Sequence, residues 1–313
     1  VCDGEEVLIG AIMEHIEEAG IHSGDSACVI PPQSLSKDVI ELVRDYMRRI
    51  ALNLRINGLI NIQMAAKDGM VYVLEVNPRA SRTIPYVAKA TGIPLAKLAA
   101  KVMLGHRLRD QGIKEREPEH KHVAVKEVVL PFMKLRGVDT ILRPEMKSTG
   151  EVMGINNGFD KAFFKAELAA GNPLPLDSNA MVFISVRDED KDEIVEVVRK
   201  LREAELAIVA TEGTSTYLRR RGLDVKELKK LHEGSPNVIE LMRTGEIKLV
   251  INTTTDRQSY RDGYQIRRAC IDLNVPYITT KEAAKAAASA ILGMKKSGCR
   301  LEVKSINEYF GIE

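Results

Sequence analysis

The chain has 313 residues, 44% of them hydrophobic and 29% charged, and a formal net charge of +2. This length can bury two cores of ordinary size, and the balance of 46 basic against 44 acidic residues excludes a polyelectrolyte surface for nucleic acid. No apolar run approaches the length needed to span a membrane. The four cysteines show no C-x-x-C spacing, so we expect reduced thiols rather than zinc or disulfides, as in a cytoplasmic protein.

The first segment begins Val-Cys-Asp-Gly, without an initiator Met or a signal peptide, so we expect the chain to begin inside a domain. The apolar run at 7–12 predicts a strand, and the prolines after Ile30 predict a loop. Ser36 is a suitable N-cap, and apolar residues at helical spacing follow it. Together they predict a helix that continues to about Leu54.

The segments 60–64 and 71–79 flank the turn signal Lys-Asp-Gly at 67–69 and predict a β-hairpin. Alternation gives it an apolar face, made of Ile60, Ile62, Met64, Tyr72, Leu74 and Val76, and a polar face, made of Asn61, Gln63, Glu75 and Asn77. We expect a three-residue turn with Gly69 in a left-handed conformation. That turn sets Asn61 opposite Glu75 and Gln63 opposite Val73, whereas a two-residue turn would put Gln63 on the wrong face.

The polar face of this hairpin carries oxygen ligands of the kind that Mg²⁺ prefers, with phosphates and water completing the shell. Arg79 and Arg82 follow directly and are fixed cations suited to the same phosphates. The alternative is a solvated polar face without a metal, because such alternation is common.

Further along, the segment 84–104 is expected to form a helix in two pieces, broken near 91–94. A charged, irregular stretch at 111–122 precedes a strand at 123–132, and a helix is expected at 159–170. The segment 171–179 contains Gly, Asn, Ser and two prolines, which is typical of a linker. We therefore place a domain boundary there.

Beyond residue 179 short apolar runs alternate with helical segments, which is typical of a parallel sheet wrapped by helices. The expected strands are 180–186, 206–210, 248–252 and 276–279, and the expected helices are 189–201, 236–243, 265–273 and 282–292. Ligands collect at the carboxyl ends of such strands. The polar segments 211–215 and 252–256 follow two of them, and Lys191 and Lys230 add positive charge, which suits a phosphate. Ordinary Ser/Thr capping is the alternative.

Several long motifs in one order give the chain a family resemblance. The hairpin followed by Glu-Val-Asn-Pro-Arg at 75–79 resembles the metal-binding hairpin of ATP-grasp enzymes. The chain as a whole resembles the second, carboxy-terminal synthetase half of the carbamoyl-phosphate synthetase large-subunit family. The motifs that carry this resemblance lie at 9–15, 20–26, 75–83, 88–100, 126–132 and 144–154. The similarity runs essentially from residue 1 to residue 313.

The resemblance implies an α/β protein of two domains. The first, 1–171, is the C-terminal part of an ATP-grasp unit with a mixed or antiparallel sheet, its core at about 1–110 and a connecting segment after it. The second, 180–313, is a Rossmann-like parallel α/β regulatory domain similar to methylglyoxal synthase. We do not infer methylglyoxal synthase activity, because the rest of the match belongs to the synthetase.

The activity that the resemblance implies is ATP-dependent phosphorylation of carbamate to carbamoyl phosphate, for pyrimidine and arginine biosynthesis. The implied cofactors are ATP, Mg²⁺ or Mn²⁺, and K⁺. The implied partners are the preceding part of the large subunit, a small glutaminase subunit and small-molecule effectors, without nucleic acid or membrane. Because the preceding part would complete the ATP site, we expect the chain alone to be inactive.

The resemblance also implies roles for particular residues, each carried over to a matching position. Metal ligands are Gln63, Glu75 and Asn77, and Arg79, Arg82 and Asn77 are the catalytic positions beside the transferred phosphoryl group. A nucleotide-contacting turn comprises Gly20, Ile21, His22 and Ser23. Positions for an allosteric nucleotide, UMP or IMP, are Lys191, Thr211, Thr214, Lys230, Asn252 and Thr254. Positions for ornithine are Glu17, Asp25 and Glu127. Such phosphoryl transfer depends on positioning and charge neutralisation, so no general base is assigned.

Plainer interpretations of these residues stay open. Isolated acids are usually solvated, and His22 alone is typical of a surface turn. Two other functions also compete with the synthetase. One is a different ATP-grasp carboxylate–amine ligase, and the other is a non-catalytic nucleotide-binding regulatory module.

Overall fold

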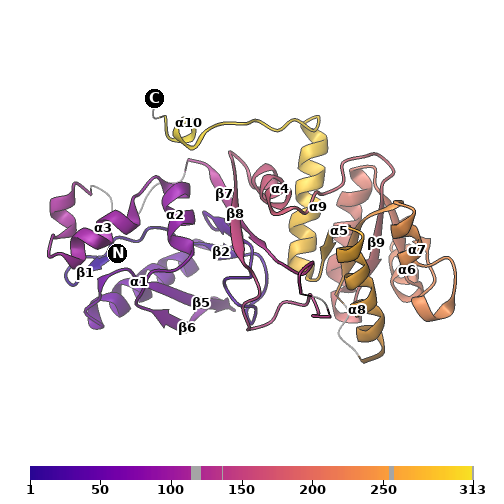
Figure 1. The fold of residues 1–313 in the computed structure, drawn as a ribbon, viewed down its shortest axis with the longest axis horizontal. Coiled ribbons are helices and arrows are strands. Elements are labelled where there is room, and N and C mark those ends of the chain that lie inside the picture. Colours follow the sequence, from indigo (N-terminus) through magenta and orange to yellow (C-terminus); the bar gives the residue numbers. More distant parts are fainter. Residues whose placement is uncertain (114–120, 136, 254–256, 312–313) are drawn as a thin grey trace. The chain divides into compact units, whose positions relative to one another are not determined.

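The computed structural model describes residues 1–113, 121–135, 137–253 and 257–311 (Figure 1). The chain forms two compact units. The first comprises Val1–His15, Cys28–Lys126 and Val303–Glu313, and the second comprises Ile16–Ala27 and Glu127–Glu302. Each unit has its own buried core.

The first unit is built around helix α1 (Lys37–Asn53) and the hairpin of strands β5 (Asn61–Lys67) and β6 (Met70–Asn77). The Ser36 hydroxyl accepts a hydrogen bond from the Val39 amide at 3.4 Å, which confirms the predicted cap. A buried cluster that includes Cys2, Val7, Ile9, Ala51 and Ile60 packs against this helix and hairpin. Beside it, β1 (Cys2–Asp3) pairs antiparallel with β4 (Asn57–Gly58).

After the hairpin come α2 (Thr83–Thr91), α3 (Leu95–Met103) and the short 3-10 helix η1 (Leu108–Gln111). Gly92 ends α2 in a left-handed conformation (φ 74°), so the predicted break is confirmed. The last short helix, α10 (Ile306–Phe310), belongs to this unit too. Its Phe310 ring lies against Gly92 and makes an edge-on contact with the His122 ring, with centroids 5.2 Å apart.

Strands β2 (Glu14–His15), β3 (Cys28–Ile30) and β7 (Val123–Val129) form an antiparallel ladder, in which Cys28 faces Lys126. The strand expected at 7–12 is wrong. Val7 makes only an isolated bridge with Cys2, and Leu8 exchanges two hydrogen bonds with Val1. Leu8 and Ile9 are buried, so this apolar run reflected burial rather than pairing in a sheet.

The second unit contains β8 (Gly150–Asn156), α4 (Phe159–Ala170) and a five-stranded parallel sheet. Helix α4 has the predicted bounds. The sheet order is β11-β10-β9-β12-β13. Its strands are β9 (Met181–Ser185), β10 (Ala207–Ala210), β11 (Lys226–Glu227), β12 (Ile247–Asn252) and β13 (Tyr277–Ile278).

Helices alternate with these strands, which confirms the predicted α/β class. They are α5 (Lys191–Glu203), α6 (Glu212–Arg219), α7 (Val238–Arg243), α8 (Arg257–Asp272) and α9 (Lys281–Lys296), with 3-10 turns η2 (Asp188–Asp190) and η3 (Leu231–Glu233). Helices α7 and α8 bury Val238, Met242, Ile266 and Cys270 against Phe183 and its neighbours in the sheet. Helix α9 packs against both α4 and α5 (Figure 1). Strands β8 and β11 and helix α6 were not expected from the sequence.

Among the described helices, none combines the length and the apolar character that crossing a membrane requires. None of the four cysteines forms a disulfide; Cys2, Cys28 and Cys270 are buried and Cys299 is exposed.

Candidate functional site

The β5–β6 hairpin turns in two residues, not three. Lys67 pairs with Met70, and the turn residues Asp68 and Gly69 both have positive φ, 52° and 76°. This combination is typical of a type I′ turn, whose twist matches that of the flanking strands. Gly69 is left-handed as expected, but the expected three-residue turn is wrong.

A bulge then corrects the register that a two-residue turn alone would impose. Met64 pairs with Val73 and Gln63 pairs with Glu75, so Leu74 is the additional residue on β6. Asn61 pairs with Asn77. The expected pairings of Asn61 with Glu75 and of Gln63 with Val73 are therefore wrong, yet all four polar residues still share one face.

The opposite face of the hairpin is apolar along its length, with Ile62, Met64 and Ala66 of β5 paired with Val76, Val73 and Val71 of β6. Ile62 and Val76 pack against the core cluster of the first unit. Tyr72 pairs with Ala65 and Leu74 is the bulged residue, so their expected place on the apolar face beside Ile62 is wrong. Both side chains are exposed, 46% and 57%. The bulge at Leu74 changes which residues of β6 face inward, and this is why the simple alternation failed.

The polar face offers one carboxylate, Glu75, and three amide side chains within two paired strands. This set of hard oxygen donors fits a divalent cation such as Mg²⁺. Arg79 lies in the exposed segment after β6, where its guanidinium donates to the Ala80 carbonyl at 3.0 Å, and Arg82 is the N-cap of α2. Both arginines are thus close in sequence to the end of the strand that carries Glu75 and Asn77.

The turn at Gly20–Ser23 lies in the second unit. Gly20 has a φ of 111°, and the His22 amide donates to the Arg143 carbonyl at 3.0 Å. The Gly24 amide donates to Nδ1 of His22 at 3.0 Å, so this ring nitrogen is an acceptor. These contacts, one through the backbone and one through the His22 ring, define the shape of the turn.

A small cavity of about 50 Å³ lies at the carboxyl ends of three adjacent strands of the parallel sheet, β10, β9 and β12. We call it the nucleotide cavity, after the ligand that the sequence predicts for its residues. Its walls include Ser185, Thr211, Lys229, Lys230, Asn252 and Asp262. Three of the predicted effector positions, Thr211, Lys230 and Asn252, therefore lie together, where a parallel sheet is expected to bind ligands.

Two more predicted effector positions, Thr214 and Lys191, adjoin the start of α6, the helix that follows β10. Thr211 is the N-cap of α6, and Thr214 is buried in its first turn. The Lys191 ammonium lies 3.6 Å from the position that a Cβ on Gly213 would take, so its charge adjoins the same helix start. Cations and backbone N–H groups at a helix N-terminus suit an anion. The sixth position, Thr254, lies outside the described residues.

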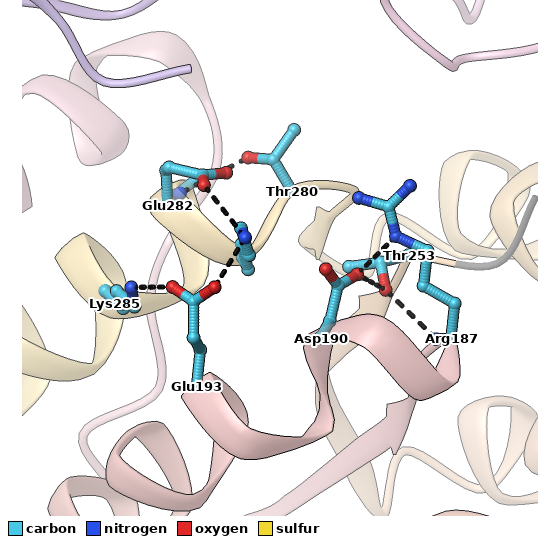
Figure 2. Close-up of polar contacts among 9 residues, drawn as sticks. Arg187, Asp190, Glu193, Thr253, Thr280, Glu282 and Lys285 are labelled. Atoms are coloured by element: carbon cyan, nitrogen blue, oxygen red, sulfur yellow. Dashed lines mark hydrogen bonds and ion pairs between the residues drawn. The ribbon is translucent and has the colours of Figure 1, made fainter. Parts of the chain in front are cut away.

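The backbone just after β12 is anchored by a buried carboxylate. Figure 2 shows the Asp190 carboxylate facing both Arg187 and Thr253. Its Oδ2 accepts from Arg187 Nε at 2.8 Å and from the Thr253 hydroxyl at 2.6 Å. Nearby, Glu193 of α5 forms ion pairs with Lys281 and Lys285 of α9. The Asp190 contact therefore holds Thr253, which directly follows the cavity residue Asn252 in the chain.

A larger cavity of about 270 Å³ in the second unit has four carboxylic acids in its walls, and we call it the acidic cavity. They are Glu17, Asp25, Glu127 and Glu167, with Tyr277 and Thr280 on the side of β13. Both carboxylate oxygens of Asp25 accept hydrogen bonds, from the backbone amides of Lys147 (2.7 Å) and Ser148 (2.9 Å). Glu17 accepts from the Ala27 amide at 2.7 Å.

Glu167 differs from the other acids in its electrostatics. Burial raises the pKa of Glu167 well above its usual value near 4.5, and the neighbouring Glu127 carboxylate raises it further, against a hydrogen bond from Asn172. Asp25, Glu127 and Glu167 are all buried. A cavity with this excess of acid favours a cationic ligand over an anionic one.

Sequence reasoning missed several residues of these cavities. Ser185 and Asp262 in the nucleotide cavity and Glu167 in the acidic cavity carried no motif. Arg267, whose Nη1 donates to the cavity residue Asn252 at 2.8 Å, had a usable signal: it shares a helical stripe with Cys270 and Ile271 of α8, both buried. A charged residue on an apolar stripe predicts a buried ion pair.

Family models match both the N-terminal and the C-terminal region of the chain. Residues 3–111 match the family described as "Carbamoyl-phosphate synthase L chain, ATP binding domain", and residues 193–279 match "MGS-like domain". A carbamoyl phosphate synthase large chain of Methanosarcina barkeri is 62% identical over 309 residues, 99% of this chain and 77% of that protein. The large chain of Methanosarcina mazei is also 62% identical, but there the chain spans 28% of the relative's length.

Solved structures add little to this result. The biotin carboxylase domain of a single-chain bacterial carboxylase gives a TM-score of 0.41 at 16% identity, covering 54% of this chain and 44% of that one. A likeness at this level does not bear on function.

Proposed function

Because the chain belongs to the carbamoyl phosphate synthase large chain family, we propose that it forms the metal-binding half of an ATP-dependent site that phosphorylates carbamate, joined to a regulatory domain. The chain spans only 28% of the length of the Methanosarcina mazei large chain. The preceding part of the subunit would supply the rest of the ATP site, and a small glutaminase subunit would supply ammonia. This division makes the chain inactive by itself. Thiols outside any disulfide support a cytoplasmic location.

The observation that carries this proposal is the pairing of Gln63 with Glu75 on one face of the hairpin, next to Asn77. These residues would hold Mg²⁺ or Mn²⁺. A bound divalent ion would neutralise charge on the ATP phosphates. Arg79 and Arg82 would bind the oxygens of the transferred phosphoryl group and orient it. K⁺ is a further ion that we assign to the complete subunit.

The regulatory part of the proposal rests on the nucleotide cavity. Two hydroxyls, two lysines, an amide and one carboxylate gather there at the ends of parallel strands, beside the start of α6. We assign it the phosphate of a nucleoside monophosphate, UMP first and IMP second. The acidic cavity is assigned ornithine, because two ammonium groups match several buried carboxylates better than a neutral ligand would.

The decisive experiment joins this chain to the preceding part of the Methanosarcina mazei large chain and measures carbamoyl phosphate formed from ATP, bicarbonate and ammonia. We expect activity in the joined protein, loss of activity in Glu75→Gln, and retained activity in Asp68→Asn. The control removes a carboxylate from the same hairpin at the turn, away from the polar face. A joined protein without activity, alongside an active intact Methanosarcina subunit, would contradict the catalytic assignment.

If the catalytic assignment fails while UMP still binds, the chain is a nucleotide-binding regulatory module. If the joined protein consumes ATP without requiring bicarbonate, it is a different ATP-grasp ligase.

A further inference from the structure

The C-terminal helix α10 is attached to the first unit by two neighbouring aromatic residues. The rings of Tyr309 and Phe310 both make edge-on contacts with the ring of His122, with centroids 5.5 Å and 5.2 Å away. Aromatic rings prefer this arrangement to flat stacking, because the positive edge of one ring meets the negative face of the other. His122 is only 7% exposed, so it is a buried anchor for this helix.

The helix α10 is too short to be stable by itself. It has five residues, whereas isolated helices in water are marginal below roughly 12–15 residues. Its capping box, formed by Ser305 and Glu308, satisfies amides of the first turn. The rest of its stability must come from packing, and therefore from Tyr309 and Phe310.

The contacts of these rings converge on the C-terminal end of α2. The Phe310 ring lies 3.1 Å from the position that a Cβ on Gly92 would take, so a side chain there would collide with it. Nε2 of His122 donates to the Ala90 carbonyl at 2.8 Å, since a carbonyl can only accept. Carbonyls in the last turn of a helix lack helical partners, so this hydrogen bond satisfies one of them. Phe310 and His122 together thus hold the last turn of α2.

The opposite end of α2 carries Arg82, which is the N-cap of the helix. The helix has only nine residues, so its two ends move together as one short element. In its first half, the Tyr86 hydroxyl donates to the Ala124 carbonyl at 2.8 Å, and Tyr86 is 4% exposed. A helix attached at one point can tilt about that point, whereas a second attachment at its end fixes its direction. The contacts at Gly92 and Ala90 are this second attachment.

We propose that Tyr309 and Phe310 are positioning residues for phosphoryl transfer: by holding His122 and the last turn of α2, they fix the direction of the helix that begins at Arg82. This rests on the role proposed for Arg82. Phosphoryl transfer depends on positioning, so a small displacement of the arginine is enough to slow it. The C-terminal segment thereby contributes to a reaction from the far end of α2.

The attachment itself is tested on the 313-residue chain by hydrogen exchange of the α2 amides. Variants are Tyr309→Ala, Phe310→Ala and both together, and circular dichroism confirms that each is folded. We expect exchange in the last turn of α2 to become about fivefold faster or more in the double variant. Phe310→Tyr keeps the ring and should keep the protection. Val303→Ala is the control, because Val303 is 95% exposed in the segment before α10. Unchanged exchange in the folded double variant would overturn the proposal.

The effect on the reaction is tested in the chain joined to the preceding part of the Methanosarcina mazei large chain, with kcat and the KM of ATP measured separately. We expect Phe310→Ala to lower kcat by about tenfold and to change KM less, because Arg82 acts on the transferred group. In an Arg82→Lys background the same change should lower kcat little further, while its effect on the melting temperature persists.

Two results would contradict this role. If the losses of kcat in Phe310→Ala and Arg82→Lys multiply fully in the double variant, Phe310 contributes to stability alone and the positioning role is wrong. A joined wild-type protein without activity would overturn the proposed function, and the positioning role with it. Hydrogen exchange separates the two cases, because it measures the attachment of α2 whether or not the joined protein is active.

Discussion

Gln63 and Glu75 face each other across the β5–β6 hairpin, and this pairing depends on two local departures from a regular ladder. The turn at Asp68 and Gly69 is one residue shorter than the polar pattern requires, and the bulge at Leu74 adds one residue back. Neither feature alone leaves the polar residues on one face. Bulges of this kind often re-aim side chains near functional sites.

Gly69→Ala tests the turn. At a φ of 76° a Cβ is strained, so we expect the free energy of unfolding to fall by about 1–2 kcal/mol. Urea denaturation of the chain measures this. Asp68→Asn is the control, since asparagine tolerates positive φ and should change stability little. Equal stability of Gly69→Ala and the wild-type chain would argue for a different turn.

Glu75→Gln tests the metal site in this chain without ATP. We expect its Mn²⁺ affinity to fall by about tenfold or more, because even indirect changes around a metal cost 10–100-fold. Electron paramagnetic resonance of free Mn²⁺ measures the bound fraction. Asp68→Asn, which removes a carboxylate from the same hairpin, should bind as the wild type does. If both variants lose affinity alike, the ion is held by general negative charge and not by the polar face.

The sequence predicted elements that are defined locally and missed those that depend on distant partners. Helix α4 came out at its observed bounds, and the Ser36 cap and the break at Gly92 were visible as local signals. The run at 7–12 failed because apolar residues indicate burial but do not show whether a partner strand exists. Its Leu8 is buried without belonging to a ladder.

In the candidate sites, too, local features were predictable from the sequence and contacts between distant residues were not. The shared polar face of the hairpin was predictable from alternation, but its register was not. Turn length and bulge compensate for each other, and many combinations of the two fit one pattern. The contact of Arg267 with Asp139 joins residues 128 positions apart, and no spacing rule connects them.

Thr214→Ala tests the proposed effector site next to the nucleotide cavity by removing one buried hydroxyl in the first turn of α6. A hydrogen bond to a charged group contributes about 1.5–3 kcal/mol, so the UMP Kd should rise about 10–100-fold. Titration calorimetry measures it, with IMP as the second nucleotide. Thr216→Ala on the same helix is the control and should leave the Kd unchanged. A loss of affinity in both variants would indicate damage to α6 rather than removal of a ligand contact.

Glu167→Gln tests the electrostatics of the acidic cavity. Burial and Glu127 raise the pKa of Glu167 in the folded chain, so the unfolded chain releases this proton first as the pH increases. Glu167 therefore lowers the stability of the fold progressively from about pH 4.5 up to its folded-state pKa. The loss is about 1.4 kcal/mol for each pH unit between the two pKa values.

The glutamine variant keeps the shape of the protonated acid and cannot ionise. We expect it to match the wild type in urea denaturation at pH 4 and to be more stable at pH 7.5. Adding ornithine at pH 7.5 should narrow this difference, because a bound cation favours the ionised carboxylate and so offsets the cost of burying it. A constant difference between the two proteins at both pH values would mean that Glu167 acts through packing and not through its charge.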